Sequence, residues 1–257
     1  VAGTPRPTIE QINCAIEAIK GITLTVRRGE VVTILGANGA GKSTFIKTMS
    51  GVHPQTSGDI YFEGKPLKFD DPRDAIKAGI ATVYQDLAMI PLMSVSRNFF
   101  MGNEPVKKVG PLNFFDHDHA NQVTMDEMRK MGINLRGPDQ AVGTLSGGER
   151  QTVAIARAVY FGARVLILDE PTSALGVRQT SNVLATIDRV RKQGVGVVFI
   201  SHNVRHALAV GDRFTVLNRG QTLGTATRGD ITPEELQDLM AGGQEMAQLE
   251  GSLGGTV

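Results

Sequence analysis

Cysteine is almost absent from this sequence of 257 residues, and tryptophan is missing altogether. The single Cys14 excludes an internal disulfide and a cysteine metal site, which is typical of a protein in a reducing compartment. Net charge is also lacking, because 27 lysines and arginines balance 26 aspartates and glutamates. This balance argues against a protein that neutralises many phosphates along nucleic acid, so we expect no nucleic-acid partner.

Long apolar runs are missing as well. Residues Val1–Ile9 contain no long apolar stretch, and runs such as Val197–Ile200 are far shorter than the roughly 18 residues of a membrane span. We therefore expect neither a signal peptide nor a transmembrane helix. Hydrophobic residues make up 41% and charged residues 21%, which are ordinary globular values and argue against a disordered polymer or a coiled coil.

Short apolar runs alternate along the chain with stretches of helical spacing. Each run predicts a buried strand: Val31–Leu35, Ile80–Val83, Val165–Leu168, Val197–Ile200 and Phe214–Leu217. The order of strand, helix and strand predicts an α/β fold with a largely parallel sheet and helices on both faces. The stretch from about Asp86 to Gly143 lacks this rhythm and predicts a mainly helical insertion.

A glycine-rich loop follows the first predicted strand and leads into a predicted helix. Its sequence GANGAGKS fits the phosphate-loop pattern G-x-x-x-x-G-K-S/T, and a chance match in a chain of this length is on the order of one in a hundred. We expect Lys42 to reach the β- and γ-phosphates of a nucleotide and the Ser43 hydroxyl to bind Mg²⁺. The backbone N–H groups of the loop can donate hydrogen bonds to the phosphate oxygens, and the positive end of the helix dipole attracts them. The predicted binding residues are Gly36, Asn38, Gly39, Ala40, Gly41, Lys42, Ser43 and Thr44.

Two carboxylates follow the predicted strand Val165–Leu168, at the edge where α/β sheets bind ligands. We expect Asp169 to hold Mg²⁺, largely through its water shell. Glu170 is expected to take a proton from, or to orient, the water that attacks the γ-phosphate. The alternative is a pair of acidic residues that merely end a strand, which the upstream phosphate loop disfavours.

The motif LSGGERQ predicts a second helix N-terminus that could bind phosphate, because Ser146, Gly147 and Gly148 precede a helical stretch. Alone, this motif would indicate only a capped helix.

Five motifs in order make the chain, from about Gly21 to Met240, resemble the ATP-binding cassette ATPases, the motor subunits of ABC transporters. They are GANGAGKST, VYQD with Gln85, LSGGE, LDEPTSAL and ISHN with His202. The resemblance implies a P-loop NTPase-type sheet core with a mainly helical inserted subdomain, and ATP with Mg²⁺ as cofactors. It also implies a head-to-tail homodimer, in which Ser146–Gly148 of one subunit closes on the γ-phosphate bound by the other.

The same resemblance implies that Gln85 contacts Mg²⁺ and the attacking water, while His202 contacts the γ-phosphate. Without the other motifs, Gln85 would be a solvated polar residue and His202 part of a helix cap.

A single ABC ATPase domain is expected over residues 1–240. Its catalytic core would comprise about 1–85 and 160–240, with a helical subdomain over about 86–159. Residues 241–257 hold five glycines and predict a flexible tail.

Further stretches look like the branch of the family that imports simple sugars of the ribose or fructose type: Val83–Val95, Asn98–Gly102 and Pro171–Gly176. This implies ATP hydrolysis that powers a membrane importer, with permease subunits and a substrate-binding protein as partners. The chain would lie at the cytoplasmic face of the membrane, held there by the permease. Residues Asp86–Gly102 would face that permease, although their apolar side chains could equally be core.

Two departures from the family pattern keep alternatives open. Gly176 stands where the family usually has an aspartate that connects the two sites, and the position near Asn13, where an aromatic usually stacks on adenine, lies in Thr8–Ile19 without any aromatic. Ile12 or Ile16 could cover the base instead. The other functions considered are a poorly hydrolysing nucleotide-switched clamp and a non-transport cassette acting on nucleic acid or ribosomes.

Overall fold

One six-stranded sheet organises the computed structural model, which describes residues 19–242. The strand order is β10-β9-β1-β8-β7-β4, and every neighbouring pair is parallel except β10 with β9. The strands are β1 (Val31–Leu35), β4 (Ile80–Val83), β7 (Val165–Asp169), β8 (Gly196–Ser201), β9 (Arg213–Asn218) and β10 (Gln221–Thr227). The predicted parallel sheet is thus confirmed. The additional β10 has a largely exposed sequence, QTLGTAT, without the apolar run that marks the other strands.

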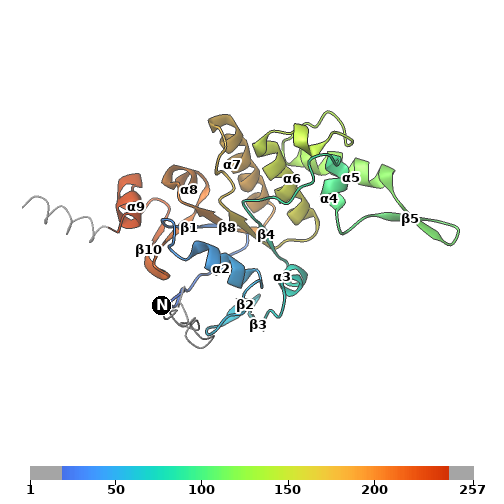
Figure 1. Cartoon of the computed structure of the whole chain (residues 1–257). Coiled ribbons are helices and arrows are strands. Elements are labelled where there is room, and N and C mark those ends of the chain that lie inside the picture. Colours follow the sequence, from blue (N-terminus) through green and yellow to red (C-terminus); the bar gives the residue numbers. More distant parts are fainter. Residues whose placement is uncertain (1–18, 243–257) are drawn as a thin grey trace, which may run out of the picture.

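Helices cover both faces of this sheet, as predicted (Figure 1). One face carries α6 (Gly147–Tyr160), α7 (Val177–Lys192), α8 (Val204–Val210) and α9 (Pro233–Met240), and the other carries α2 (Lys42–Met49) and α3 (Pro72–Ala78). Successive side chains of a strand point to opposite faces. Val197 and Phe199 of β8 therefore pack in the first layer, and Val198 and Ile200 in the second.

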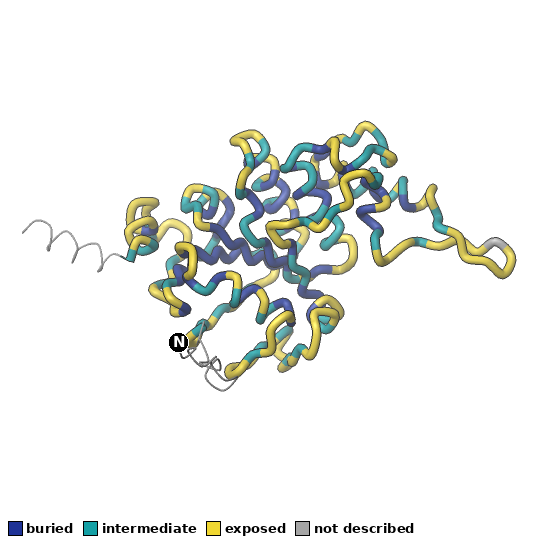
Figure 2. The backbone as a smooth tube through the Cα atoms, viewed as in Figure 1, coloured by how far each residue is buried: buried dark blue, intermediate teal, exposed yellow. Residues whose placement is uncertain are grey.

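The central strands β1 and β8 are buried along their whole length. Figure 2 shows this as a dark blue centre within a largely yellow and teal periphery. Their sequences, VVTIL and GVVFIS, are apolar without alternation because both faces of the sheet are covered. The sheet is therefore a rigid base for the loops at its edge.

The predicted helical insertion contains α4 (Val95–Phe100), α5 (His117–Lys130) and a short 3₁₀ helix at Val142–Thr144. It also holds a hairpin of β5 (Val106–Val109) and β6 (Leu112–Phe115), which projects from the body (Figure 1). The expected mainly helical insertion is confirmed, and the hairpin interrupts it at a place that the sequence pattern does not predict. Gly110-Pro111 forms the turn, with Gly110 at φ 61°, and breaks helical continuity.

A second small hairpin, β2 (Ile60–Phe62) and β3 (Lys65–Leu67), lies beside α2 and α3 (Figure 1). The division of the chain into a core and a helical subdomain stays a prediction. Within residues 19–242, no helix is both long enough and apolar enough to cross a lipid bilayer.

An aromatic cluster fixes α4 against the end of α6. The ring of Phe99 lies 5.3 Å from that of Phe100 and 5.5 Å from that of Tyr160, and Phe99 is fully buried. Nearby, Arg157 of α6 donates a hydrogen bond of 2.5 Å to the carbonyl of Met101. These contacts hold the C-terminal part of α6 against α4. The N-terminus of α6, capped by Ser146, lies at the other end of the helix.

Phe99→Ala is expected to lower the free energy of unfolding by about 3–5 kcal/mol, because it opens a cavity in a close-packed cluster. Phe114→Ala, in the exposed hairpin, is the matched control and should change stability by less than about 0.5 kcal/mol. Urea titration followed by circular dichroism measures both. Equal losses in the two variants would contradict this account of the packing.

Candidate active site

The loop between β1 and α2 is shaped by two glycines with different requirements. At Gly36, a Cβ atom would lie 2.5 Å from the carbonyl oxygen of Leu217, so only glycine allows this close approach. Gly41 caps α2 with φ at 98°, a left-handed conformation that side chains disfavour. The loop therefore curls back over the sheet edge and points the N-terminus of α2 into the space above it.

Lys42 is the first residue of α2, and its side chain lies inside the loop. Its ammonium donates hydrogen bonds of 2.5 Å to the carbonyl of Gly36 and 3.0 Å to that of Ala37. The residue is only 8% exposed. A buried cation and the backbone N–H groups of a helix N-terminus together form a site suited to an anion.

Acidic and amide side chains face this loop from two other strands. Asp169 ends β7, Glu170 follows it, and Gln85 comes shortly after β4. Together with the loop they line a cavity of about 500 Å³. Its described lining is Asn38, Gly39, Ala40, Gly41, Lys42, Ser43, Thr44, Gln85, Asp169, Glu170 and Arg219. The structure therefore brings together most of the residues predicted from separate motifs, while Gly36 lies buried beneath them.

The carboxyl of Asp169 is half-buried beside a second carboxyl. Burial raises its pKa above the ordinary value, the charge of Glu170 raises it further, and the ammonium of Lys42 opposes both effects. A bound cation would stabilise the ionised form of Asp169 in the same way as Lys42 does. Positive charge beside Asp169 would therefore lower the pKa of this carboxyl, next to the anion-binding loop.

Glu170 is held by strand β8 and by His202, the residue that follows β8. Its backbone N–H donates to the carbonyl of Ile200 at 3.0 Å, and its φ of 49° is left-handed. Its carboxylate oxygen Oε1 lies 3.0 Å from Nδ1 of His202, and Ser201 Oγ donates to Oε2 at 3.5 Å. Among the described residues, His202 lines a different pocket and reaches this cavity through its contact with Glu170. The carboxylate therefore has a fixed direction at the cavity wall.

Ser146–Gly148 lie apart from this cavity. Ser146 caps α6: its hydroxyl accepts from the N–H of Glu149 at 3.3 Å, while its own N–H donates to the Glu149 carboxylate at 2.7 Å. Gly148 packs against Gln179 of α7, where a Cβ atom would lie 3.0 Å from a backbone oxygen. None of the three lines the cavity among the described residues. Within one chain, this second helix N-terminus does not meet the phosphate loop.

Arg219 lines the cavity but was not among the predicted residues. It lies in the turn between β9 and β10. The signal was present in the sequence, because Asn218-Arg219-Gly220 follows a predicted strand and is turn-like. That strand is parallel to β1, so its carboxyl end reaches the same sheet edge as the phosphate loop.

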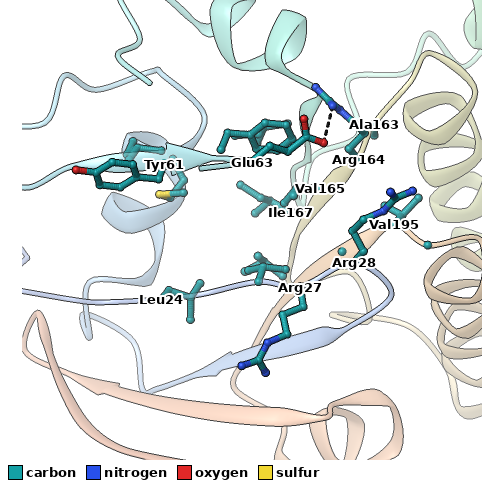
Figure 3. A pocket seen from close by; sticks show the side chains of 18 of the residues that line it. Leu24, Arg27, Arg28, Tyr61, Glu63, Ala163, Arg164, Val165, Ile167 and Val195 are labelled. Carbon is teal, nitrogen blue, oxygen red and sulfur yellow. Dashed lines mark hydrogen bonds and ion pairs between the residues drawn. The ribbon is translucent and has the colours of Figure 1, made fainter. Parts of the chain in front are cut away.

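A more apolar cavity, of about 420 Å³, lies near the opposite ends of the strands (Figure 3). Leu24, Val165 and Ile167 line it, and Arg164 forms an ion pair of 2.7 Å with Glu63 at its rim. Val165 is the first residue of β7, whereas the carboxylates stand at the other end of that strand. This cavity is therefore separate from the phosphate-binding edge.

Some predicted features lie outside the described residues or have another local role. Asn13, Cys14 and all but the first two residues of the expected tail 241–257 lie outside residues 19–242. Gly176 is the N-cap of α7 and leaves that helix without a side-chain cap, which an aspartate would supply.

A family model described as ABC transporter matches residues 19–173. The chain is 41% identical over 230 residues to the xylose/arabinose import ATP-binding protein XylG of Sulfolobus acidocaldarius, and covers 88% of each protein. It is 41% identical over 222 residues to the fructose import ATP-binding protein FrcA of Rhizobium meliloti, covering 84% of this chain and 85% of FrcA. It also matches the ribose import ATP-binding protein RbsA of Burkholderia pseudomallei, at 37% identity over 244 residues. That match covers 93% of this chain but only 47% of RbsA, about half of its length.

Among solved structures, the ADP conformation of MJ1267, an ATP-binding cassette of an ABC transporter, superposes with a TM-score of 0.75 at 22% identity. The match covers 90% of this chain and 91% of that one, and it supports the fold. The phosphate loop, the paired carboxylates and the family match agree, and the chain belongs to the ABC transporter family.

Proposed function

We propose that this chain binds and hydrolyses ATP to power a membrane importer of a monosaccharide. The observation that carries the proposal is the single cavity in which the phosphate loop faces Asp169, Glu170 and Gln85. The named sugar-import relatives support the substrate class, since they match along most of this chain. Which sugar is imported would depend on the permease and on a substrate-binding protein.

The donors at this cavity suit Mg²⁺. A hydroxyl at Ser43, an amide oxygen at Gln85 and a carboxylate at Asp169 are hard oxygen ligands. Over residues 19–242, no three His, Cys, Asp or Glu side chains gather as a metal cage, which fits an ion held partly by substrate phosphates. When bound, Mg²⁺ supplies positive charge to the β- and γ-phosphate oxygens.

The residues of the chain then have distinct tasks. Lys42 exchanges its bonds to loop carbonyls for bonds to the β- and γ-phosphates, and the loop N–H groups hold the same oxygens. Glu170, held in direction by its contact with His202, accepts a proton from the attacking water or orients it. His202 lies 3.0 Å from the Glu170 carboxylate, and from there it would also contact the γ-phosphate.

A second copy of the chain would complete the site. Ser146–Gly148 present a capped helix N-terminus that has no phosphate to meet within its own subunit. Arranged head to tail, two chains would each offer this helix end to the γ-phosphate held by the other. The proposed active unit is therefore a homodimer with two composite sites.

A groove beside the site suits a permease segment. About 320 Å³ in volume, it lies between α3, β4 and α6, and its lining includes Tyr84, Leu87, Met89 and Phe161. Leu92, in the same connecting segment, is 94% exposed. An apolar groove beside exposed apolar residues favours a protein partner. Docked there, the chain would lie at the cytoplasmic face of the membrane without entering it.

Lys42→Ala is expected to weaken ATP binding at least tenfold, because charge-assisted hydrogen bonds contribute about 1.5–3 kcal/mol each. Lys47→Ala removes the same charge from the exposed side of the same helix and is the matched control. Isothermal titration calorimetry measures both affinities. A similar small effect of the two substitutions would remove Lys42 from the proposed role.

Glu170→Gln is expected to keep ATP affinity within a few-fold and to slow phosphate release by about 10²–10⁴, the usual contribution of a general base. Glu234→Gln, on the exposed surface of α9, should leave turnover unchanged. A continuous phosphate assay with Mg-ATP gives the rates. Near-normal turnover of the Glu170→Gln protein would show that another group activates the water.

ATP is expected to promote dimerisation when hydrolysis is blocked, because the bound γ-phosphate provides the contact for Ser146–Gly148 of a partner. Light scattering of the Glu170→Gln protein with Mg-ATP should show a dimer that disappears without nucleotide. Adding Lys42→Ala to the same protein should abolish it. A strictly monomeric Glu170→Gln protein at high concentration would contradict self-sufficient dimerisation.

A further inference from the structure

Arg219 lies at the end of the cavity opposite the hydrolytic residues. Asp169 and Glu170 come from the end of β7 and Gln85 from the end of β4, whereas Arg219 follows β9. In the order β9-β1-β8-β7-β4, the phosphate loop after β1 stands between them. With strands about 4.8 Å apart, the ends of β9 and β7 are separated by roughly 14 Å. The cavity therefore has two chemically different ends.

This geometry orients a bound nucleotide. If the γ-phosphate faces Glu170, as proposed above, the chain of phosphates runs across the loop and the nucleoside emerges on the side of β9. No aromatic side chain lines the cavity among the described residues. Arg219 is the lining residue that comes from this side.

The turn that carries Arg219 is held firmly in place. Asn218 pairs with Gln221, so Arg219 and Gly220 form a two-residue hairpin loop, with φ of 46° and 79°. Two positive φ values define the type I′ turn that suits antiparallel strands. The N–H of Gly220 donates to the carbonyl of Ala40 at 3.0 Å, which ties the turn to the phosphate loop. The position of Arg219 relative to the loop is thereby fixed, while its side chain stays exposed.

We propose that the Arg219 guanidinium stacks on the base of the bound nucleotide and supplies part of its affinity. A planar guanidinium stacks on nucleobases, and it does so on any base because every base has a π-face. Arg219 then strengthens binding of ATP and GTP alike and gives little selectivity between them. This inference rests on the proposed nucleotide site.

The test compares nucleotides with inorganic tripolyphosphate, which has the phosphates but no base. The Arg219→Asn variant removes the guanidinium, and asparagine tolerates the left-handed backbone of this turn. Arg219→Lys keeps the charge but removes the plane. Arg73→Asn, at an exposed position on α3, is the control for the loss of one arginine. Calorimetry on the full chain gives the affinities, and thermal unfolding checks that each variant is folded.

Both Arg219 variants are expected to bind ATP and GTP about tenfold more weakly, and tripolyphosphate with unchanged affinity. The Arg73→Asn protein should match the unmodified chain. Equal losses for tripolyphosphate and nucleotides, with rescue by lysine, would overturn the proposal and make Arg219 a phosphate ligand. Unchanged affinities would overturn it as well. If the unmodified chain binds neither ATP nor tripolyphosphate, the proposed nucleotide site itself is wrong and this inference falls with it.

Discussion

The convergence of parallel strands at one sheet edge is the constraint on which the rest of the structure depends. Because β1, β4, β7, β8 and β9 run in the same direction, whatever follows each strand is delivered to that edge. The phosphate loop, Gln85, the two carboxylates, His202 and Arg219 come from five separate parts of the sequence and depend on this arrangement. The central strands are buried on both faces, and such close packing resists distortion. The loops at the edge are therefore attached to a rigid sheet.

The sequence predicts the parts of the site that depend on local backbone chemistry. The phosphate loop can be predicted because its glycines and lysine lie within eight consecutive residues. The buried strands can be predicted because they are continuous apolar runs. Other features depend on distant contacts. The β5–β6 hairpin is exposed and carries no strong period, and β10 is mostly polar, so neither leaves an apolar signature. The contact between Glu170 and His202, and the place of Arg219, follow from strand order, which no single motif specifies.

The segment after β4 connects two cavities. Gln85 lines the cavity of the phosphate loop, while its neighbours Tyr84 and Asp86 line the apolar groove beside α6. The Tyr84 hydroxyl also donates to Oγ of Ser50, at the end of α2. If a partner docks in the groove as proposed, its movement would act on three consecutive residues, of which the middle one lines the cavity of the phosphate loop. These three residues would then be a short physical route between the two cavities.

Lys42 has a further consequence for which anions can enter. Its ammonium is already bonded to two loop carbonyls in a nearly closed environment, so the loop supplies an internal competitor for that cation. An incoming ligand must offer oxygens that outmatch two neutral carbonyls held at short range. Carriers of several negative charges close together meet this requirement most strongly, because each ionised oxygen can make a charge-assisted hydrogen bond to the ammonium. The two bonds that Lys42 makes to the loop therefore favour ligands of high charge density, such as a chain of phosphates.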